Sequence, residues 1–265
     1  MAMIKSTTIL QFLFRKPYGI HSPFLYDYAS RCLFNKEKNP DFEVIEKIRK
    51  AYLKSGKKLT VKDYGQGSRL DRAGGKPPFT AEKKLNRIAS RSLQKPRYCR
   101  VLYHTANFFQ AQTILELGTS LGISTAYLAK ACPKAKVFTL EGCPEISKVA
   151  LETFKKAGTP NVIQITGEFG RELPGLLQQL GKADLVYLDG NHGYNPVMDY
   201  FSLISKHLHS RSVFIVDDIR WSKGMWKAWK ALQEVPQKTL SIDLGKLGIL
   251  FFDPKLSREN LMIGF

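Results

Sequence analysis

The stretch that decides the fold is Ile114-Leu115-Glu116-Leu117-Gly118-Thr119-Ser120-Leu121-Gly122-Ile123-Ser124-Thr125. An apolar run leads into two glycines four residues apart, and a helical pattern begins after Gly122. Glycine lets the backbone turn sharply after a strand, and the first amides of a helix are free to bind a ligand. Ser120 stands where the dinucleotide fingerprint requires glycine, which disfavours the pyrophosphate-binding form of this turn. The stretch therefore predicts a strand, a tight turn and a helix.

The rest of the chain after Thr113 repeats this unit. Short β-branched runs alternate with amphipathic stretches, which is typical of parallel strands joined by crossover helices. Two later runs, 238–242 and 247–252, are separated by so short a turn that they can only form antiparallel strands. The expected strands of the parallel part are 113–117, 136–140, 161–165, 184–188 and 212–216, and the expected helices are 123–132, 144–157, 170–181, 194–207 and 223–234.

Residues 1–112 lack this alternation and are predicted to form a mainly helical, basic extension or cap. A stretch rich in glycine and proline, 64–79, predicts a long loop within it, either a lid over a ligand or a simple connector. We therefore divide the chain into the extension and an α/β domain at 113–265. The expected helices of the extension lie near 41–54, 80–93 and 96–110.

The net charge of +18 is concentrated in the extension. Residues 1–112 contain 23 Lys and Arg against 8 Asp and Glu, a net charge of +15, whereas residues 113–265 carry a net charge of +3. The basic side chains are scattered over helix-like segments and rarely alternate with aromatic residues, as single-strand nucleic-acid binders require. A solvated basic face is favoured, and a nucleic-acid partner is not.

Composition excludes several classes of protein. With 43% hydrophobic and 24% charged residues in 265, the chain is globular, and it has no apolar stretch long enough to cross a membrane. The N-terminus has no small-residue cleavage site before its first basic pair, so we expect no secretory signal. The four cysteines form no Cys-x-x-Cys pattern, which favours reduced thiols and a cytoplasmic location.

Acidic side chains follow the ends of three predicted strands. Glu141 ends the second strand, Asp189 follows the fourth, and Asp217 and Asp218 follow the fifth. Ligands of open α/β sheets bind at the carboxyl ends of parallel strands. Carboxylates that converge there repel each other unless a cation neutralises them, and Mg²⁺ prefers such oxygen ligands. The alternative is that Asp217 or Asp218 caps a helix or pairs with Arg220.

Together these features resemble the class I S-adenosylmethionine-dependent methyltransferases, in the branch similar to catechol O-methyltransferase. The resemblance covers about residues 113–253 and rests on the pattern Glu116-x-Gly118-x-x-x-Gly122-x-Ser124, on the strand-end acids and on the closing antiparallel pair. It implies a Rossmann-like α/β fold with a seven-stranded mixed sheet of order 3-2-1-4-5-7-6. The seventh strand would be antiparallel, and helices would flank the sheet.

The resemblance also implies a role for the loop after each strand. In the family, the first loop wraps the methionine part of the cofactor, the acid after the second strand holds the ribose, and the loop after the third strand flanks the adenine. For Glu168, a solvated loop acid is the alternative. The implied cofactor-binding residues are Glu116, Gly118, Thr119, Ser120, Gly122, Ser124, Glu141, Gly142, Glu168, Phe169 and Asp189.

The reaction centre implied by the resemblance contains Asp189 and His192. In the metal-dependent branch of the family, the equivalents of Asp189, Asp217 and Asp218 hold a divalent cation such as Mg²⁺. His192 stands where catechol-type relatives carry a catalytic lysine, and an imidazole with a pKa near ~6.5 suits a general base at neutral pH. A metal-ligand role and a structural role for His192 stay open. Trp221 is placed to stack on a planar acceptor.

We therefore expect an S-adenosylmethionine-dependent O-methyltransferase acting on a small-molecule acceptor, with deprotonation by a metal or by His192. One alternative is an RNA or other nucleic-acid methyltransferase that uses the basic extension. Against it, the fourth strand lacks the Asn-Pro-Pro-Tyr type of sequence that amino methylation of bases usually needs. The other alternative is a non-catalytic cofactor-binding protein, which the retained Glu116 and Gly118 disfavour. A homodimer stays open.

Overall fold

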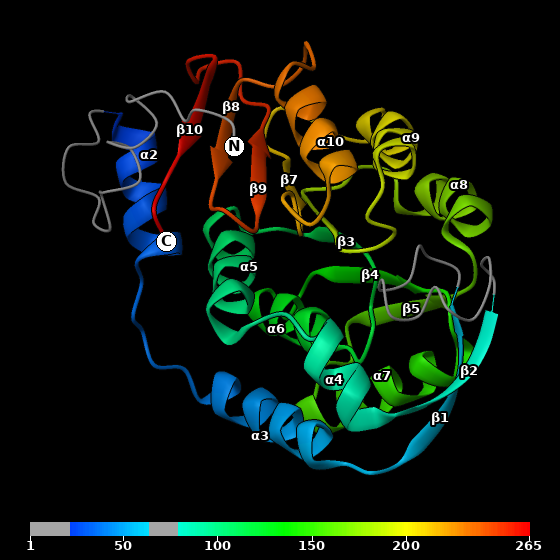
Figure 1. The fold of residues 1–265 in the computed structure, drawn as a ribbon. Helices are drawn as coiled ribbons and strands as arrows, with labels where there is room; N and C mark the ends of the chain where they lie inside the picture. The colour runs from blue at the N-terminus through cyan, green and yellow to red at the C-terminus, as the bar shows by residue number, and fades with distance from the viewer. Residues whose placement is uncertain (1–21, 64–78) are drawn as a thin grey trace.

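The computed structural model describes residues 22–63 and 79–265 (Figure 1). Within these residues the central sheet has eight strands in the order β10-β8-β9-β7-β6-β3-β4-β5. The strands are β3 (Thr113–Leu117), β4 (Lys136–Glu141), β5 (Val162–Thr166), β6 (Leu185–Leu188), β7 (Val213–Val216), β8 (Leu240–Asp243), β9 (Gly248–Phe251) and β10 (Glu259–Met262).

The sheet is mixed, as the sequence predicted. Strands β3 to β7 are mutually parallel, whereas β9 is antiparallel to both of its neighbours, β7 and β8. If β3 is counted as the first strand of the domain, the observed order is the predicted 3-2-1-4-5-7-6, with β10 added at the edge. The expected count of seven is wrong because β10 pairs in parallel with β8. Its sequence, ENLM, is short and half polar, so it carries little local signal for a strand.

Helices cover both faces of the sheet. Alternate residues of each strand point to opposite faces, so Ile114 joins one hydrophobic cluster and Leu115 the other. The second cluster lies under α8, α9 and α10, which Figure 1 shows side by side. The helices that join the strands are α6 (Ile123–Ala131), α7 (Pro144–Ala157), α8 (Phe169–Leu180), α9 (Tyr194–Ser205) and α10 (Lys223–Gln233).

The extension differs from its prediction in one region. Residues 80–93 were expected to be helical, but β2 (Phe79–Lys84) occupies the first part and α4 (Leu85–Ser92) the rest. Strand β2 pairs antiparallel with β1 (Lys58–Asp63), in which Leu59 and Val61 alternate toward the interior. This period of two was present in the sequence but spans too few residues to predict a strand. The predicted loop at 64–79 lies outside the described residues except for Phe79.

The helices of the extension pack on the α/β domain. Helix α3 (Pro40–Lys54) and α4 share a hydrophobic cluster with α6, to which Tyr127 contributes. Helix α2 (Pro23–Tyr28), a short π-helical segment (Ala29–Leu33) and α5 (Pro96–Phe108) pack in the cluster beneath the sheet. Among the described helices, none has the length and apolar character needed to cross a membrane.

Candidate active site

The candidate site lies where the carboxyl ends of β3, β4, β6 and β7 meet. Gly118, after β3, has a φ of +106°, and a Cβ there would come within 2.1 Å of the backbone oxygen of Asp189. Gly122 begins α6 with a φ of +78°, and a Cβ there would meet the Phe154 ring at 2.7 Å. Both positions therefore need glycine, one for the close approach of two loops and the other for a left-handed turn.

Glu116 is placed behind the first loop and is not exposed. Its side chain is fully buried, and its carboxylate accepts hydrogen bonds from the hydroxyls of Ser124 (2.6 Å), Thr139 (2.6 Å) and Thr125. Burial raises the pKa of Glu116 to about 7, although the three hydroxyls oppose this shift. In this arrangement Glu116 supports the loop by holding Ser124 and the first turn of α6.

Glu141 connects the ends of β3 and β4. Its carboxylate accepts the backbone N–H of Ser120 at 2.8 Å and that of Cys143 at 2.9 Å. The link to Ser120 was not predicted, since no sequence pattern reports which loops face each other. Thr119 points inward instead, because its hydroxyl bonds that of Thr139 at 2.6 Å and is fully enclosed.

The loop after β5 also reaches the candidate site. Phe169, at the start of α8, lies so close to the loop after β6 that a Cβ on Gly190 would be 2.5 Å from its ring. Glu168, just before it, is exposed and caps no helix through its side chain. Phe169 thus packs against Gly190 at the edge of the candidate site, whereas the Glu168 side chain is exposed. Gly142, after β4, is half-buried.

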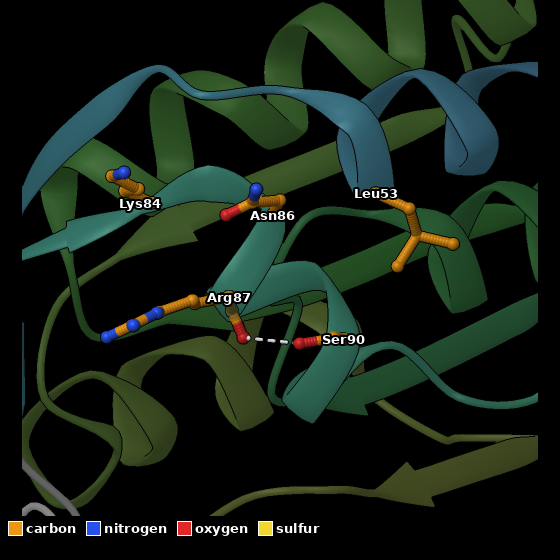
Figure 2. A pocket seen from close by; sticks show the side chains of 5 residues that line it. All are labelled: Leu53, Lys84, Asn86, Arg87 and Ser90. Carbon is orange, nitrogen blue, oxygen red and sulfur yellow. Dashed lines mark hydrogen bonds between the residues drawn. The ribbon is translucent and has the colours of Figure 1, made fainter.

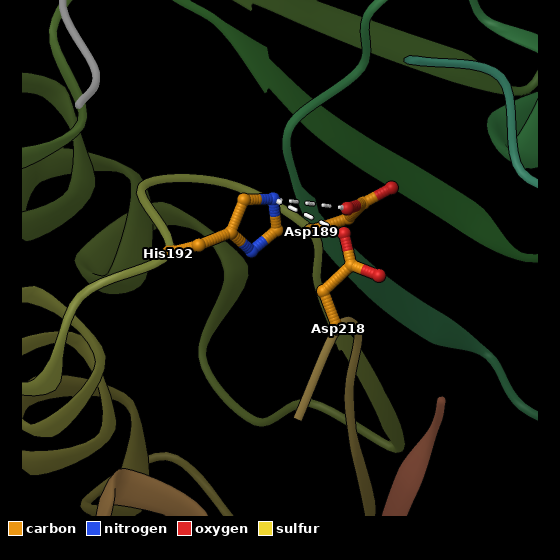
Figure 3. A group of neighbouring side chains, drawn as sticks. All are labelled: Asp189, His192 and Asp218. Carbon is orange, nitrogen blue, oxygen red and sulfur yellow. Dashed lines mark ion pairs between the residues drawn. The ribbon is translucent and has the colours of Figure 1, made fainter. Parts of the chain in front are cut away.

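The candidate reaction centre is formed by Asp189, His192 and Asp218. Figure 3 shows the imidazole pointing toward both carboxylates, with Nε2 3.8 Å from Asp189 Oδ1 and 3.8 Å from Asp218 Oδ2. All three side chains are half-buried, and their ligand atoms lie within 4.8 Å of one another. Burial, and next the negative charge of Asp217, raise the pKa of Asp189 well above its usual range.

Asp217, the third acid of the predicted metal site with Asp189 and Asp218, contacts Asp189 but is not part of this ligand group. Its side chain is buried, and both of its oxygens accept hydrogen bonds from the ammonium of Lys246, at 2.6 and 2.7 Å. The predicted alternative partner was wrong, because Arg220 pairs with Asp243 at 2.5 Å. Asp217 does form an ion pair, but its partner is Lys246 and not Arg220.

Three further side chains complete the surroundings of Asp217 and were missed by the sequence analysis. Gln94, before α5, donates to Asp217 Oδ2 at 2.7 Å and to the Tyr187 hydroxyl at 3.0 Å. The Tyr187 hydroxyl in turn lies 3.1 Å from Asp189 Oδ2. Lys246 lies in the turn between β8 and β9. The short β8–β9 connection was visible in the sequence, but its position over the end of β7 depends on the antiparallel pairing of β9 with β7.

Trp221 follows Asp218 in the chain and lies beside the reaction centre. Its side chain is 62% exposed, and its ring centroid is 6.4 Å from that of His192. A single exposed aromatic side chain is ordinary on a protein surface, so what distinguishes Trp221 is its position beside His192. Trp229, by contrast, is buried against Gly248 in the core.

A separate cavity of about 440 Å³ lies on the extension (Figure 2). None of its lining side chains is a predicted site residue, and within α4 the Ser90 hydroxyl donates to the Arg87 carbonyl at 3.0 Å. The cavity adjoins the helix that carries Ser92, whose hydroxyl bonds that of Ser120 in the first loop at 2.8 Å. Its lining residues are Leu53, Lys84, Asn86, Arg87 and Ser90.

Comparison with known proteins shows which proteins the α/β domain is similar to. Residues 115–219 match the family described as "Methyltransferase domain". The chain is 32% identical over 127 residues to a catechol O-methyltransferase of Niastella koreensis, covering 47% of this chain and 57% of that protein. It is 31% identical over 137 residues to a catechol O-methyltransferase of Mycobacterium tuberculosis, covering 51% and 59%. The chain thus matches a little over half the length of these curated relatives.

Solved structures show the same fold. An O-methyltransferase from Bacillus cereus in complex with S-adenosylhomocysteine superposes with a TM-score of 0.55 at 18% identity, covering 85% of this chain and 96% of that one. The Podospora anserina methyltransferase PaMTH1 superposes with a TM-score of 0.58 at 17% identity, covering 88% and 96%. Residues 115–219 thus match a methyltransferase domain, and the chain has the fold of these methyltransferase structures.

Proposed function

We propose that this protein transfers the methyl group of S-adenosylmethionine to an oxygen atom of a small-molecule acceptor. The observation that carries the proposal is the position of His192 between Asp189 and Asp218, at the strand ends next to the glycine loop. The catechol O-methyltransferases that the chain resembles support an oxygen nucleophile and a small acceptor.

The residues of the site fit the proposed cofactor. Gly118 leaves the backbone of the first loop bare and close to Asp189, where a side chain would fill the space. Two backbone amides orient the Glu141 carboxylate at the end of β4, so it is positioned to accept hydrogen bonds from ribose hydroxyls. Gly142 lies beside that acid, and Phe169 with Glu168 would flank the adenine. Ser120 and Ser124 would face the methionine part.

Several of the predicted cofactor-binding residues would act on the cofactor through their backbone or through a neighbouring side chain. Gly122 and the amide of Thr119 shape the first loop, and Glu116 would hold Ser124 in position rather than contact the ligand from an exposed surface. When bound, the cofactor supplies an electrophilic methyl group on a sulfonium. The chain then has to align an acceptor oxygen with that methyl group and remove its proton.

His192 is the proposed proton acceptor. Its Nε2 would take the hydroxyl proton of the acceptor as the new C–O bond forms and the S–C bond breaks. The imidazolium that results would lie between Asp189 and Asp218, and the negative charge of Asp218 would stabilise it. Asp218 would thus assist His192 electrostatically, and Asp189 lies beside the same nitrogen. Trp221, exposed beside His192, would stack on a planar acceptor.

The predicted ligand set of Asp189, Asp217 and Asp218 does not fit a divalent ion in this structure. A site made from Asp189, Asp217 and Asp218 would need Asp217 as a ligand, but Lys246 already contacts both of its oxygens. We therefore assign no step of the reaction to a metal.

Isothermal titration of S-adenosylmethionine and S-adenosylhomocysteine into the purified protein tests the proposal. We expect micromolar affinity in the wild type and loss of binding in Glu141→Ala. Glu145→Ala is the matched control, because Glu145 lies nearby in the first turn of α7 and, among the described residues, pairs with Lys148 at the surface. Absence of binding to the wild type would overturn the proposal, and equal losses in both variants would overturn the assignment of Glu141.

The remaining expectations stay predictions. These are the homodimer, the cytoplasmic location, the nucleic-acid and non-catalytic alternatives, and the division of the chain at residue 112. The extension shares hydrophobic clusters with the α/β domain.

A further inference from the structure

Lys246 lies among the carboxylates at the ends of β6 and β7. Its ammonium is 2.7 Å from Asp217 Oδ1, 2.6 Å from Asp217 Oδ2 and 3.1 Å from Asp218 Oδ1. The two contacts with Asp217 are hydrogen bonds, and the contact with Asp218 is an ion pair. Lys246 therefore binds two successive carboxylates in the manner of a small cation.

Asp217 has no further capacity to bind a metal in this arrangement. A carboxylate offers about four lone-pair positions. Lys246 occupies one on each oxygen, the backbone N–H of Asp218 donates to Oδ1 at 2.8 Å, and Gln94 donates to Oδ2 at 2.7 Å. A divalent ion would have to displace these donors and would meet the positive charge of Lys246 at close range.

The charge of Lys246 is secure. Partial burial opposes the charged form of the lysine, but attraction to Asp217, Asp218 and Asp189 outweighs this and raises its pKa above the ordinary value. The side chain is 29% exposed and extends from the turn between β8 and β9. The turn therefore delivers a permanent positive charge to the point where the strand-end carboxylates converge.

We propose that Lys246 is the resident cation of this site and takes the place of a divalent metal ion. The proposal rests on the proposed function, since it makes methyl transfer by this chain independent of metal. Lys246 acts as a positioning residue: it holds Asp218 by Oδ1, which leaves Oδ2 facing His192 Nε2. The proton of the acceptor then goes to His192 without metal coordination of the acceptor oxygen.

The proposal predicts that removal of the ammonium creates a metal site. Mn²⁺ is titrated into chelator-treated protein, without cofactor or acceptor, and free Mn²⁺ is followed by its electron paramagnetic resonance signal. We expect the wild type to leave Mn²⁺ free. Lys246→Ala exposes Asp217 beside Asp189 and Asp218, and should bind one equivalent at least tenfold more tightly than the wild type. Mn²⁺ should also raise the Tm of this variant alone.

Arg220→Ala is the matched control. It removes a cation from the same edge of the sheet and leaves a different buried acid, Asp243, unpaired. This variant should gain no Mn²⁺ site. If Lys246→Ala does not fold, Lys246→Gln, which keeps a hydrogen-bond donor, replaces it.

Two results would overturn the proposal. One is a wild-type protein that binds one equivalent of Mn²⁺ at micromolar concentration and loses it in Asp218→Asn, an outcome that needs no Lys246 variant. The other is a folded Lys246 variant without any gain in Mn²⁺ binding. Because these titrations contain no cofactor, they can succeed even where S-adenosylmethionine fails to bind, so failure of the proposed function is recognised separately.

Discussion

Two buried carboxylates at the same edge of the sheet are held in opposite ways. Glu116, in β3, has only hydroxyl partners, from Ser124, Thr125 and Thr139. Asp217, after β7, has an ammonium, from Lys246, in contact with both oxygens. Glu116, behind the loop proposed to bind the cofactor, therefore has no positively charged partner. Asp217, next to the proposed reaction centre, has its charge neutralised by Lys246.

The difference shows what each kind of partner supplies. Hydroxyl groups satisfy the hydrogen bonds of a carboxylate but not its charge, so burial raises the pKa of Glu116 to about 7. An ammonium supplies the charge as well, and it occupies the oxygens that a metal would need. A strand-end aspartate is thus a metal ligand only if no basic side chain reaches it first.

The largest expected effect comes from breaking the compensated pair. Lys246→Met should destabilise the protein by about 3–5 kcal/mol at neutral pH, because a buried carboxylate is left without a cation. The double variant Lys246→Met/Asp217→Asn should recover most of this loss, since the uncompensated charge is gone. Urea unfolding of the two variants and the wild type measures both values. A loss below about 1 kcal/mol in the single variant would contradict the role of the pair.

The next effect concerns the uncompensated acid. Because the folded state raises the pKa of Glu116, folding favours its protonated form. The resulting contribution to the free energy of unfolding is complete below the unfolded pKa near 4.5. It is lost as the pH rises through about 7, by on the order of 3 kcal/mol. Glu116→Gln removes this titration, so wild-type stability should fall relative to the variant between pH 5 and pH 8.

Urea unfolding of the wild type and Glu116→Gln at pH 5 and pH 8 measures this difference. Glu145→Gln is the control, because its surface carboxylate pairs only with Lys148 and should leave the pH profile of the wild type unchanged. Parallel profiles for the wild type and Glu116→Gln would show that Glu116 does not titrate in this range.

The smallest effect separates buried hydroxyls from surface ones. Thr139→Val should cost about 1–3 kcal/mol, because it removes a buried hydroxyl that bonds Glu116 and Thr119. Ser92→Ala breaks an exposed hydroxyl pair with Ser120 and should change stability by less than about 0.5 kcal/mol. Thermal unfolding at one pH distinguishes them, and similar values would argue against a special role for the hydroxyls around Glu116.

Much of the α/β domain was predictable because its signal is local. The expected strand at 113–117 and helix at 144–157 agree with β3 and α7 to the residue, and the other parallel strands and their helices lie within two residues of their expected ends. Short apolar runs and amphipathic periods depend only on neighbours in the chain. The strand order came from the resemblance and is confirmed apart from the added β10.

The errors concern pairings that no local pattern reports. Strand β2 was expected to be helical, and its pairing with β1 joins segments 15 or more residues apart. The contact between Lys246 and Asp217 was missed for the same reason, since Lys246 lies 29 residues after Asp217 in the chain. Gln94 is 123 residues before it. A sequence places acids at strand ends but does not state which basic side chain will reach them.

The sequence by itself determined the alternation of strands and helices, the glycine turn after β3 and the set of acids at the strand ends. These follow from side-chain periodicity and from backbone conformations that glycine alone adopts without strain. Only the tertiary structure decided which acids are exposed, which are buried and which cation they face. Charge compensation depends on distances of a few ångströms between segments far apart in the chain, and folding alone sets those distances.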